Sequence, residues 1–196
     1  MVGRGANDPD RRERIIAAAL EVIGERGVHQ TTHRIIAARA SVPLGSLTYY
    51  FDGLDDILEQ AFASLAGRMA EQYRASLEGA TSLEAACAAV VDLICGSYAT
   101  PDEVRALFEM YSFGNYNAKV HDLCRDWLLV SRASLGLHFT EPTARALDAL
   151  VEAFPMHQAW EAEPLSRDYV AAVVQAIVDR FEPARNGVGA RRVPRA

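Results

Sequence analysis

Helical periodicity runs through almost the whole chain, and this feature most constrains its fold. Between residues 9 and 182, apolar residues recur three and four positions apart, and no stretch alternates apolar and polar residues long enough for a strand. Half of the 196 residues are hydrophobic, which is ample for a buried core. The sequence therefore predicts an all-α protein of about nine helices.

The ends of the predicted helices are marked by capping residues, proline and glycine. Asp8-Pro9 has the form of a helix cap followed by a proline in the first turn, and Gly27 is suited to ending the first helix. The expected helices cover about 9–26, 32–40, 43–50, 52–78, 82–98, 101–112 and 117–137, then one that Thr140 opens and one that Pro164 and Ser166 open before Pro183.

Three further signals refine the second half. Thr81 with Glu84, and Thr100 with Glu103, have the spacing of a capping box, in which each side chain satisfies a backbone donor of the other. Pro155 is expected to kink or interrupt the penultimate helix, because proline removes one helical hydrogen bond and clashes with the preceding turn.

Charge is distributed unevenly along the chain. The formal net charge is −6, but residues 1–50 carry seven Arg against five acidic residues, whereas residues 51–182 carry nine Lys or Arg against 21 acidic residues. Residues 183–196 hold four Arg and no acid. The acidic average excludes a protein that coats nucleic acid by charge alone, yet the N-terminal part can meet a polyanion. We expect 1–8 to form a basic arm and 183–196 a disordered basic tail.

Targeting and disulfide signals are weak. No apolar run approaches the roughly 18 residues that span a bilayer, so no membrane partner is expected. The N-terminus is charged where a secretory signal would need an apolar segment, and three cysteines are too few for a disulfide framework. These observations favour a cytoplasmic protein.

Residues 31–51 hold two helices too short to stand alone, separated by a tight turn at Ser41-Val42. Ile36 and Leu47 are spaced to pack the pair against the first helix, and the small side chain of Ala37 allows close approach. This arrangement predicts a helix-turn-helix, whose second helix can enter the DNA major groove. An ordinary helical hairpin with aromatic packing is the alternative.

The same segment resembles a known family at several positions in order and spacing. Thr31-Thr32, Ile36-Ala37-x-x-Ala40-x-Val42, Gly45-x-Leu47 and Tyr49-x-Phe51, followed by a long helix, closely resemble the DNA-binding domain of TetR/AcrR-type transcriptional regulators over about residues 11–62. The resemblance implies a DNA-binding domain at 1–51 and a helical ligand-binding and dimerisation domain at 52–182. It also implies a ligand-responsive regulator, a repressor that a small molecule releases from its operator.

The resemblance assigns the DNA contacts residue by residue. The first of the two short helices supplies the contacts near phosphate, and the second supplies the base contacts that specify sequence. The expected DNA-binding residues are Thr32, His33 and Arg34, with Thr32 as a cap that touches phosphate; Leu44, Thr48 and Tyr49 facing base edges; Gly45, for close backbone approach; and Pro43, Ser46 and Tyr50, the last two as phosphate ligands. All six side chains of the second helix named here are expected to be exposed. A merely structural role is the alternative for Tyr49 and Tyr50.

Three positions depart from the family pattern. Ser41 stands where glycine is usual, so the turn is expected to be slightly altered. Pro43 replaces a serine cap, and Leu54 replaces a lysine that normally meets a phosphate. One salt-dependent contact is therefore expected to be missing, and the basic arm, with Arg residues 4, 11, 12 and 14, is expected to compensate.

A single helix-turn-helix makes few contacts, so a two-fold homodimer that reads a palindromic double-stranded DNA operator is expected. The last two helices carry wide apolar stripes, and the resembling family pairs these helices across its dimer as a four-helix bundle. The expected interface residues are Leu147, Val151, Phe154, Val170, Val173, Val174 and Ile177. The alternative is that both stripes close a monomeric core.

Five of the chain's 16 aromatic residues fall between positions 108 and 127. In the resembling family this region lines a pocket for a small-molecule inducer, and aromatic walls suit such a pocket. The expected ligand-binding residues are Phe108, Tyr111, Phe113, Tyr116, His121 and Trp127, for a mostly apolar or aromatic effector, with Glu109, Asn115 and Arg125 as further polar candidates. Packing within an ordinary core is the alternative. Binding is expected to tilt the long helix and change the separation of the recognition helices.

Enzyme signatures are absent from the sequence. There is no Gly-x-x-x-x-Gly-Lys phosphate loop, no His-Glu-x-x-His and no Cys-x-x-Cys, so no catalysis, cofactor or metal is expected. A metal site from His121, His157 and Cys124, and a thiol sensor built on Cys124, are the alternatives. Cys87 and Cys95 lie eight residues apart on one helix, a rise of about 12 Å, and cannot bridge. A helical dimeric ligand-binding or interaction protein without DNA binding is the rival function.

Overall fold

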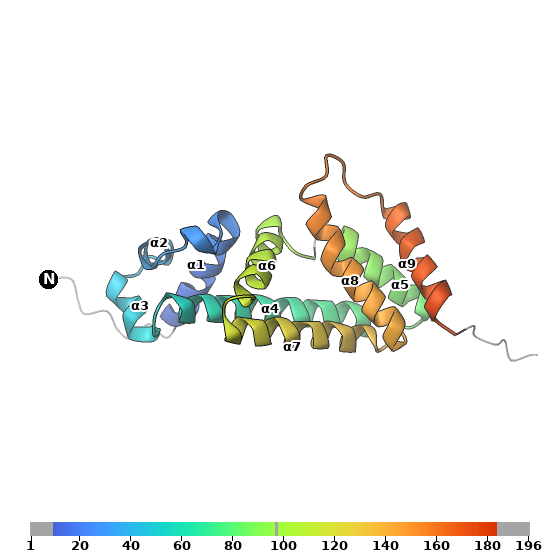
Figure 1. The fold of residues 1–196 in the computed structure, drawn as a ribbon, viewed down its shortest axis with the longest axis horizontal. Coiled ribbons are helices and arrows are strands. Elements are labelled where there is room, and N and C mark those ends of the chain that lie inside the picture. The colour runs from blue at the N-terminus through green and yellow to red at the C-terminus, as the bar shows by residue number, and fades with distance from the viewer. Residues whose placement is uncertain (1–9, 97, 184–196) are drawn as a thin grey trace, which may run out of the picture.

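The structure, a computed structural model, describes residues 10–96 and 98–183, and these residues form helices without strands (Figure 1). This confirms the predicted all-α class. The described helices are α1 (Arg11–Arg26), η1 (Val28–Gln30, a short 3-10 turn), α2 (His33–Arg39), α3 (Leu44–Tyr50), α4 (Leu54–Glu78), α5 (Leu83–Cys95), α6 (Pro101–Gly114), α7 (Ala118–Leu135), α8 (Glu141–Gln158) and α9 (Arg167–Phe181). None of these helices is both long and apolar enough to cross a membrane.

The long helix α4 runs through most of the molecule (Figure 1). Its 25 residues would span about 37 Å at the usual helical rise. Ile57, Phe62, Leu65, Met69 and Tyr73 are buried along one stripe, as the periodicity predicts. Helices α1, α5, α6 and α7 all pack against it, so α4 connects the N-terminal helices to the rest of the protein.

Two clusters of buried apolar residues share α4 between them. The first joins α1, α2 and α3 to the N-terminal half of α4 and to α6 and α7. The second joins the C-terminal end of α4, from Tyr73, to α5, α8 and α9. Because the first cluster extends across residue 51, the three N-terminal helices share a core with α4, α6 and α7.

Helix α6 lies directly against the end of α1. The guanidinium of Arg105 donates through Nε to the carbonyl oxygen of Gly24 at 2.8 Å, and the backbone N–H of Val28 donates to Oε2 of Glu109 at 2.9 Å. A Cβ at Gly24 would come within 2.7 Å of the carbonyl oxygen of Asp102. Only glycine therefore allows the two helices to approach this closely.

The structure corrects two predicted helix starts. The long helix begins at Leu54, two residues later than expected, because the cap Gly53 has φ 141°, a conformation that favours glycine. Helix α5 is capped by Ser82, whose Oγ accepts from the N–H of Ala85 at 3.1 Å; Thr81 does not cap it. The expected cap Asp8-Pro9, the basic arm 1–8 and the tail from residue 184 lie outside the described residues.

The predicted start of α6 is confirmed, whereas the end of α5 differs from the prediction. Thr100 and Glu103 form the full capping box, with Pro101 as the first residue of α6. Helix α5 ends at Cys95 before Gly96, earlier than expected, and α7 ends at Leu135. Helix α8 continues through Pro155 to Gln158, so the proline does not interrupt it. A glycine cap and a tolerated proline both depend on local backbone geometry that periodicity does not encode.

The contact of α1 with α6 predicts opposite effects for two Gly-to-Ala substitutions. Gly24→Ala should lower the free energy of unfolding by about 1–3 kcal/mol, because the new methyl group overlaps the backbone of Asp102. Gly67→Ala in α4 meets nothing within 4 Å and should raise it by about 0.5–1 kcal/mol. Urea denaturation measures both. Equal shifts of the same sign would contradict a close α1–α6 contact.

Candidate DNA-binding and effector sites

Helices α2 and α3 form the predicted helix-turn-helix. Oγ1 of Thr32 accepts from the N–H of Ile35 at 3.3 Å, which caps α2 as expected. Ser41 has φ 54°, in the left-handed region that favours glycine, so this turn keeps the backbone of a glycine turn with serine in place. Pro43 makes no side-chain cap for α3, which agrees with its departure from the family pattern.

Seven of the ten predicted DNA-contact residues are exposed, namely Thr32, Arg34, Pro43, Leu44, Gly45, Thr48 and Tyr49, while His33 and Tyr50 are half-buried. Tyr49 is 79% exposed, and its ring meets Tyr50 edge-on with centroids 4.8 Å apart. Ser46 is only 8% exposed, so the expectation of an exposed Ser46 is wrong. Helix α3 buries the two adjacent positions Ser46 and Leu47, which leaves the serine little access to a phosphate.

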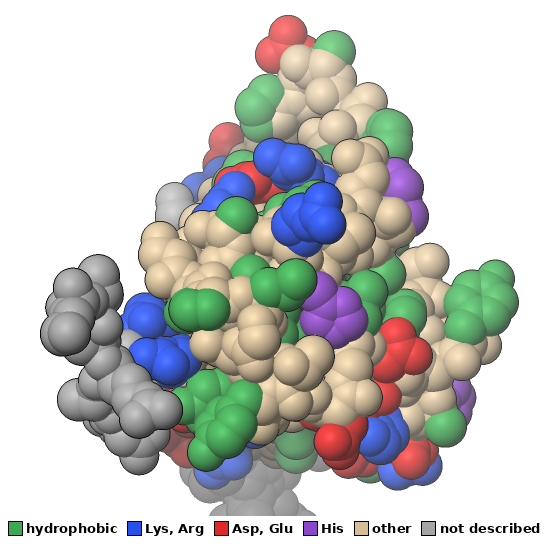
Figure 2. All heavy atoms as spheres, turned by 90° about the vertical axis from the view of Figure 1, so that its left-hand side faces the viewer, with side chains coloured by type: hydrophobic (Ala, Val, Ile, Leu, Met, Phe, Trp, Pro, Cys, Tyr) green, Lys and Arg blue, Asp and Glu red, His purple; other side chains and the backbone are tan. Residues whose placement is uncertain are grey.

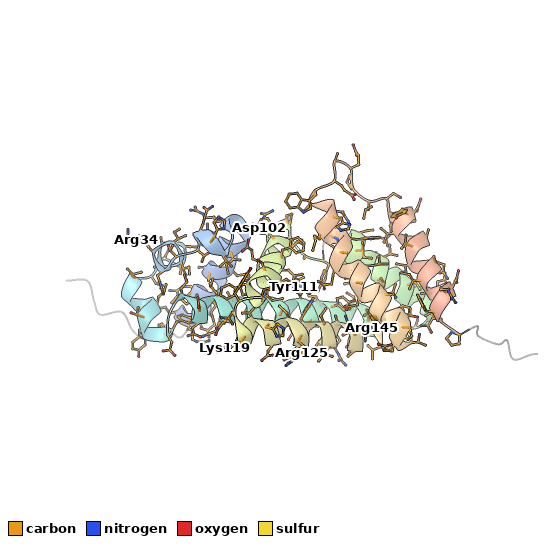
Figure 3. The ribbon with its side chains drawn as sticks, viewed as in Figure 1. Arg34, Asp102, Tyr111, Lys119, Arg125 and Arg145 are labelled. Atoms are coloured by element: carbon orange, nitrogen blue, oxygen red, sulfur yellow. The ribbon has the colours of Figure 1, made fainter. Side chains whose placement is uncertain are left out.

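The end of the protein that α2 and α3 form carries scattered rather than concentrated positive charge (Figure 2). Figure 2 shows separate groups of basic side chains with hydrophobic and uncharged ones between them. Arg39 is paired with Glu21 at 3.0 Å and Glu25 at 2.5 Å, and the Arg12 guanidinium lies 5.6 Å from the centre of the Phe51 ring. Leu54 packs against the core, so the start of α4 adds no positive charge, and its first turn carries the acidic residues Asp55 and Asp56. Arg34 remains exposed at this end, as Figure 3 shows.

A cavity of about 500 Å³ lies among α4, α5, α6, α7 and α8, with the segments after α5 and α8 at its edge. Of the predicted ligand residues, Phe108 and Trp127 line it. Further aromatic walls come from Tyr73, Tyr98 and Trp160. A volume of this size, with mostly apolar walls, suits an organic molecule.

The other predicted ligand residues lie elsewhere. Tyr111 lines a smaller adjoining hollow of about 300 Å³. Phe113 packs on Phe62 with ring centroids 6.0 Å apart, Tyr116 is 90% exposed, and His121 is exposed. Glu109, Asn115 and Arg125 do not line the cavity either. Aromatic density along the chain located the region, but the helical phase of each side chain decides whether it faces the cavity.

Sequence reasoning missed Glu152, the only carboxylic acid among the described residues that line the cavity. Its Oε2 accepts from the Tyr111 hydroxyl and its Oε1 from the indole N–H of Trp127, both at 3.0 Å. Burial raises the pKa of this carboxyl to about 7, and the two hydrogen bonds only partly oppose that shift. The signal that could have found it is the spacing of Asp148 and Glu152, four residues apart on an otherwise apolar helical face.

The predicted dimer residues separate into two groups. Leu147, Val151, Val170 and Val174 are buried in the second core cluster, so they close the core of one protomer, as the monomeric alternative supposed. Phe154, Val173 and Ile177 are half-buried and remain partly accessible. Each stripe was wide enough for both roles, and the sequence could not assign positions to one or the other.

The three cysteines are half-buried, and burial raises the pKa of each thiol. A raised pKa reduces the thiolate fraction and disfavours the thiol-sensor alternative. Within the described ranges, no three potential ligand side chains are grouped as a metal site would require, so His121, His157 and Cys124 do not come together as one.

Residues 15–61 match the family model described as bacterial regulatory proteins, tetR family. Over 197 residues the chain is 26% identical to the HTH-type transcriptional regulator BetI of Rhizobium meliloti, covering 96% of this chain and 97% of that protein. The solved structure of SCO7518, described as a transcriptional regulator of Streptomyces coelicolor A3(2), is 34% identical with a TM-score of 0.77, covering 86% of this chain and 98% of that one.

A crystal structure of the multidrug binding protein EbrR complexed with ethidium is 29% identical, with a TM-score of 0.69, and covers 87% of this chain and 99% of that one. The relatives are transcriptional regulators, and the likeness extends over both the helix-turn-helix and the cavity-forming helices. The chain belongs to the TetR family of bacterial transcriptional regulators and is a ligand-responsive, DNA-binding protein.

Proposed function

We propose that this chain is a homodimeric repressor that binds a palindromic operator and leaves it when a small molecule fills the 500 Å³ cavity. One observation carries the proposal: helices α6 and α4, which line the cavity, also pack against α1 of the helix-turn-helix unit. Residues 1–51 would read DNA, and residues 52–182 would bind the effector and the second protomer.

In this proposal, the exposed side chains of α3 contact the DNA bases. Leu44 and Tyr49 offer apolar atoms suited to thymine methyl groups, and the hydroxyl of Thr48 can accept or donate a hydrogen bond. That hydroxyl donates to the carbonyl oxygen of Gly45 at 3.2 Å, which leaves its lone pairs for a base. Thr32 and Arg34 at the start of α2 would meet phosphates and fix the register.

In this proposal, the outward faces of α8 and α9 form the dimer interface. Phe154 on α8 and Tyr169 on α9 stack with ring centroids 6.4 Å apart, and Tyr169 is largely exposed. Val173 and Ile177 follow on α9 at helical spacing. A second copy would cover these partly accessible apolar side chains in a four-helix arrangement.

In this proposal, effector binding changes DNA binding through two helices, α4 and α6. Arg105 and Phe108 of α6 line the cavity, and Arg105 also holds the carbonyl oxygen of Gly24 at the end of α1. On α4, Met69 of the first core cluster and Tyr73 of the second line the same cavity. A shift of either helix would change the separation of the two α3 helices, which must match about 34–36 Å on DNA.

The regulator proposal predicts that the DNA upstream of the chain's own gene binds the purified protein, measured by fluorescence anisotropy at low salt. Tyr49→Ala should weaken this binding about tenfold or more, because a base contact contributes about 1–3 kcal/mol. Tyr116→Ala removes an even more exposed tyrosine at the α6–α7 turn and should leave affinity unchanged. A folded dimer that retards no upstream fragment would favour the rival function, an interaction protein without DNA binding.

The dimer proposal predicts that Val173→Glu yields monomers by size-exclusion chromatography with light scattering, because each interface would bury two uncompensated charges. Leu129→Glu places the same charge on an exposed apolar position of α7 and should leave the dimer intact. A Val173→Glu protein that remains dimeric, or a wild type that is monomeric at micromolar concentration, would rule out this interface.

A further inference from the structure

The carboxyl of Glu152 faces the cavity, and none of the described residues gives it a positive partner. Within the part of the chain that the structure describes, the two hydrogen bonds that it accepts come from neutral donors, the Tyr111 hydroxyl and the Trp127 indole. Among the described residues, no ion pair within 4 Å involves it. A buried carboxylate without a countercharge costs free energy, and the cavity beside it is the place from which a countercharge can come.

Asp148, one turn earlier on α8, provides the contrast. This carboxyl is 1% exposed, and it accepts from Oγ of Ser131 at 2.5 Å and from Nε of Arg132 at 2.8 Å. Its charge is therefore paired inside the protein. The same helix face thus holds one acid with an internal cation and one acid without.

Among the described residues, the charged and titratable groups around Glu152 do not supply its missing countercharge. They are Asp148 on α8, Tyr73 on α4, Tyr98 before α6, Arg105 and Tyr111 on α6, and Cys124 and Arg132 on α7. Arg105 also lines the cavity, but its guanidinium is bound to Asp102 and to the carbonyl oxygen of Gly24. Burial raises the pKa of the three tyrosines and of the Cys124 thiol, so these groups stay neutral near pH 7.

The rest of the cavity suits an organic cation. Tyr73, Tyr98, Phe108, Trp127 and Trp160 supply aromatic walls, and aromatic faces attract cations electrostatically. The hydroxyl of Tyr73, a side chain that is 1% exposed, has no hydrogen-bond partner among the residues that the structure describes. A ligand with a polar group beside its charge would satisfy that hydroxyl.

We propose that the cavity binds an organic monocation, a quaternary or protonated amine with an apolar or aromatic body, whose charge pairs with the carboxylate of Glu152. The inference rests on the proposed function in one respect, namely that the cavity is the effector site. It deepens that function by naming the chemical class of the effector.

Binding of such a cation depends on pH in a defined direction. The raised pKa of about 7 means that Glu152 is mostly protonated at pH 6 and mostly ionised at pH 8. Affinity for a permanently charged ligand should therefore rise about tenfold between these pH values. Because the neutral acid is favoured in the folded state, ligand-free stability falls as pH rises from about 4.5 to about 7, and Glu152→Gln removes that contribution.

The experiment compares phenyltrimethylammonium, whose charge is permanent, with tert-butylbenzene, its uncharged isostere. Fluorescence titration uses Trp127 and Trp160, which line the cavity. At pH 8 the wild type should bind the cation at least about tenfold more tightly than the isostere, and the preference should shrink at pH 6. Glu152→Gln removes the charge and keeps one acceptor oxygen, which can accept from Trp127 while its NH2 group donates to the Tyr111 hydroxyl oxygen, and it should bind both molecules equally.

Two further variants separate the carboxylate from general charge. Glu152→Asp should retain part of the cation preference, and Glu161→Gln removes an exposed acid next to Trp160 and should leave it unchanged. Equal wild-type binding of the two molecules, no cation binding at pH 8, or a preference that survives in Glu152→Gln would each overturn the proposal. Operator binding by the ligand-free protein is measured alongside. DNA binding without cation preference would refute only this inference, whereas cation preference without DNA binding would refute only the regulator.

Discussion

Burial of one face of α4 along its length is the constraint on which the rest of the structure depends. Ile57 and Phe62 complete the core under the helix-turn-helix, and Tyr73 and Leu77 complete the core under α5, α8 and α9. Neither cluster closes without this helix, because each lacks a wall where α4 passes. A rigid rod shared by two cores transmits a displacement at one end to the other, since packed interiors deform little.

The contact between α1 and α6 gives this arrangement a second connection. Gly24 brings the two backbones together, and Arg105 and Glu109 each bond to the backbone near the end of α1. Arg105 is also part of the cavity wall. One side chain thus touches both the place where an effector would sit and the unit that carries α3. Coupling between the two sites needs no long chain of intermediate residues.

The sequence predicted those features that depend on period and on residue size. The buried stripe of α4, the Thr32 cap and the capping box of α6 follow from local pattern, and the structure confirms them. Features that depend on neighbouring helices were missed. Ser46 is buried by the way α3 packs, and Glu152 gains its importance from Tyr111 and Trp127, which lie far away in the sequence.

Charged residues have different roles in the N-terminal unit and in the rest of the protein. Arg39 is held by Glu21 and Glu25, and the start of α4 has no basic residue, so neither position is available to attract phosphates. Non-specific DNA affinity should accordingly be low, and specific binding would rely on two fitted α3 helices. A weak electrostatic contribution also makes release easier, because an effector then has to offset only the geometric fit. In the body, Asp148 pairs with the guanidinium of Arg132 on α7, whereas Glu152 accepts from the neutral donors Tyr111 and Trp127 and lines the cavity.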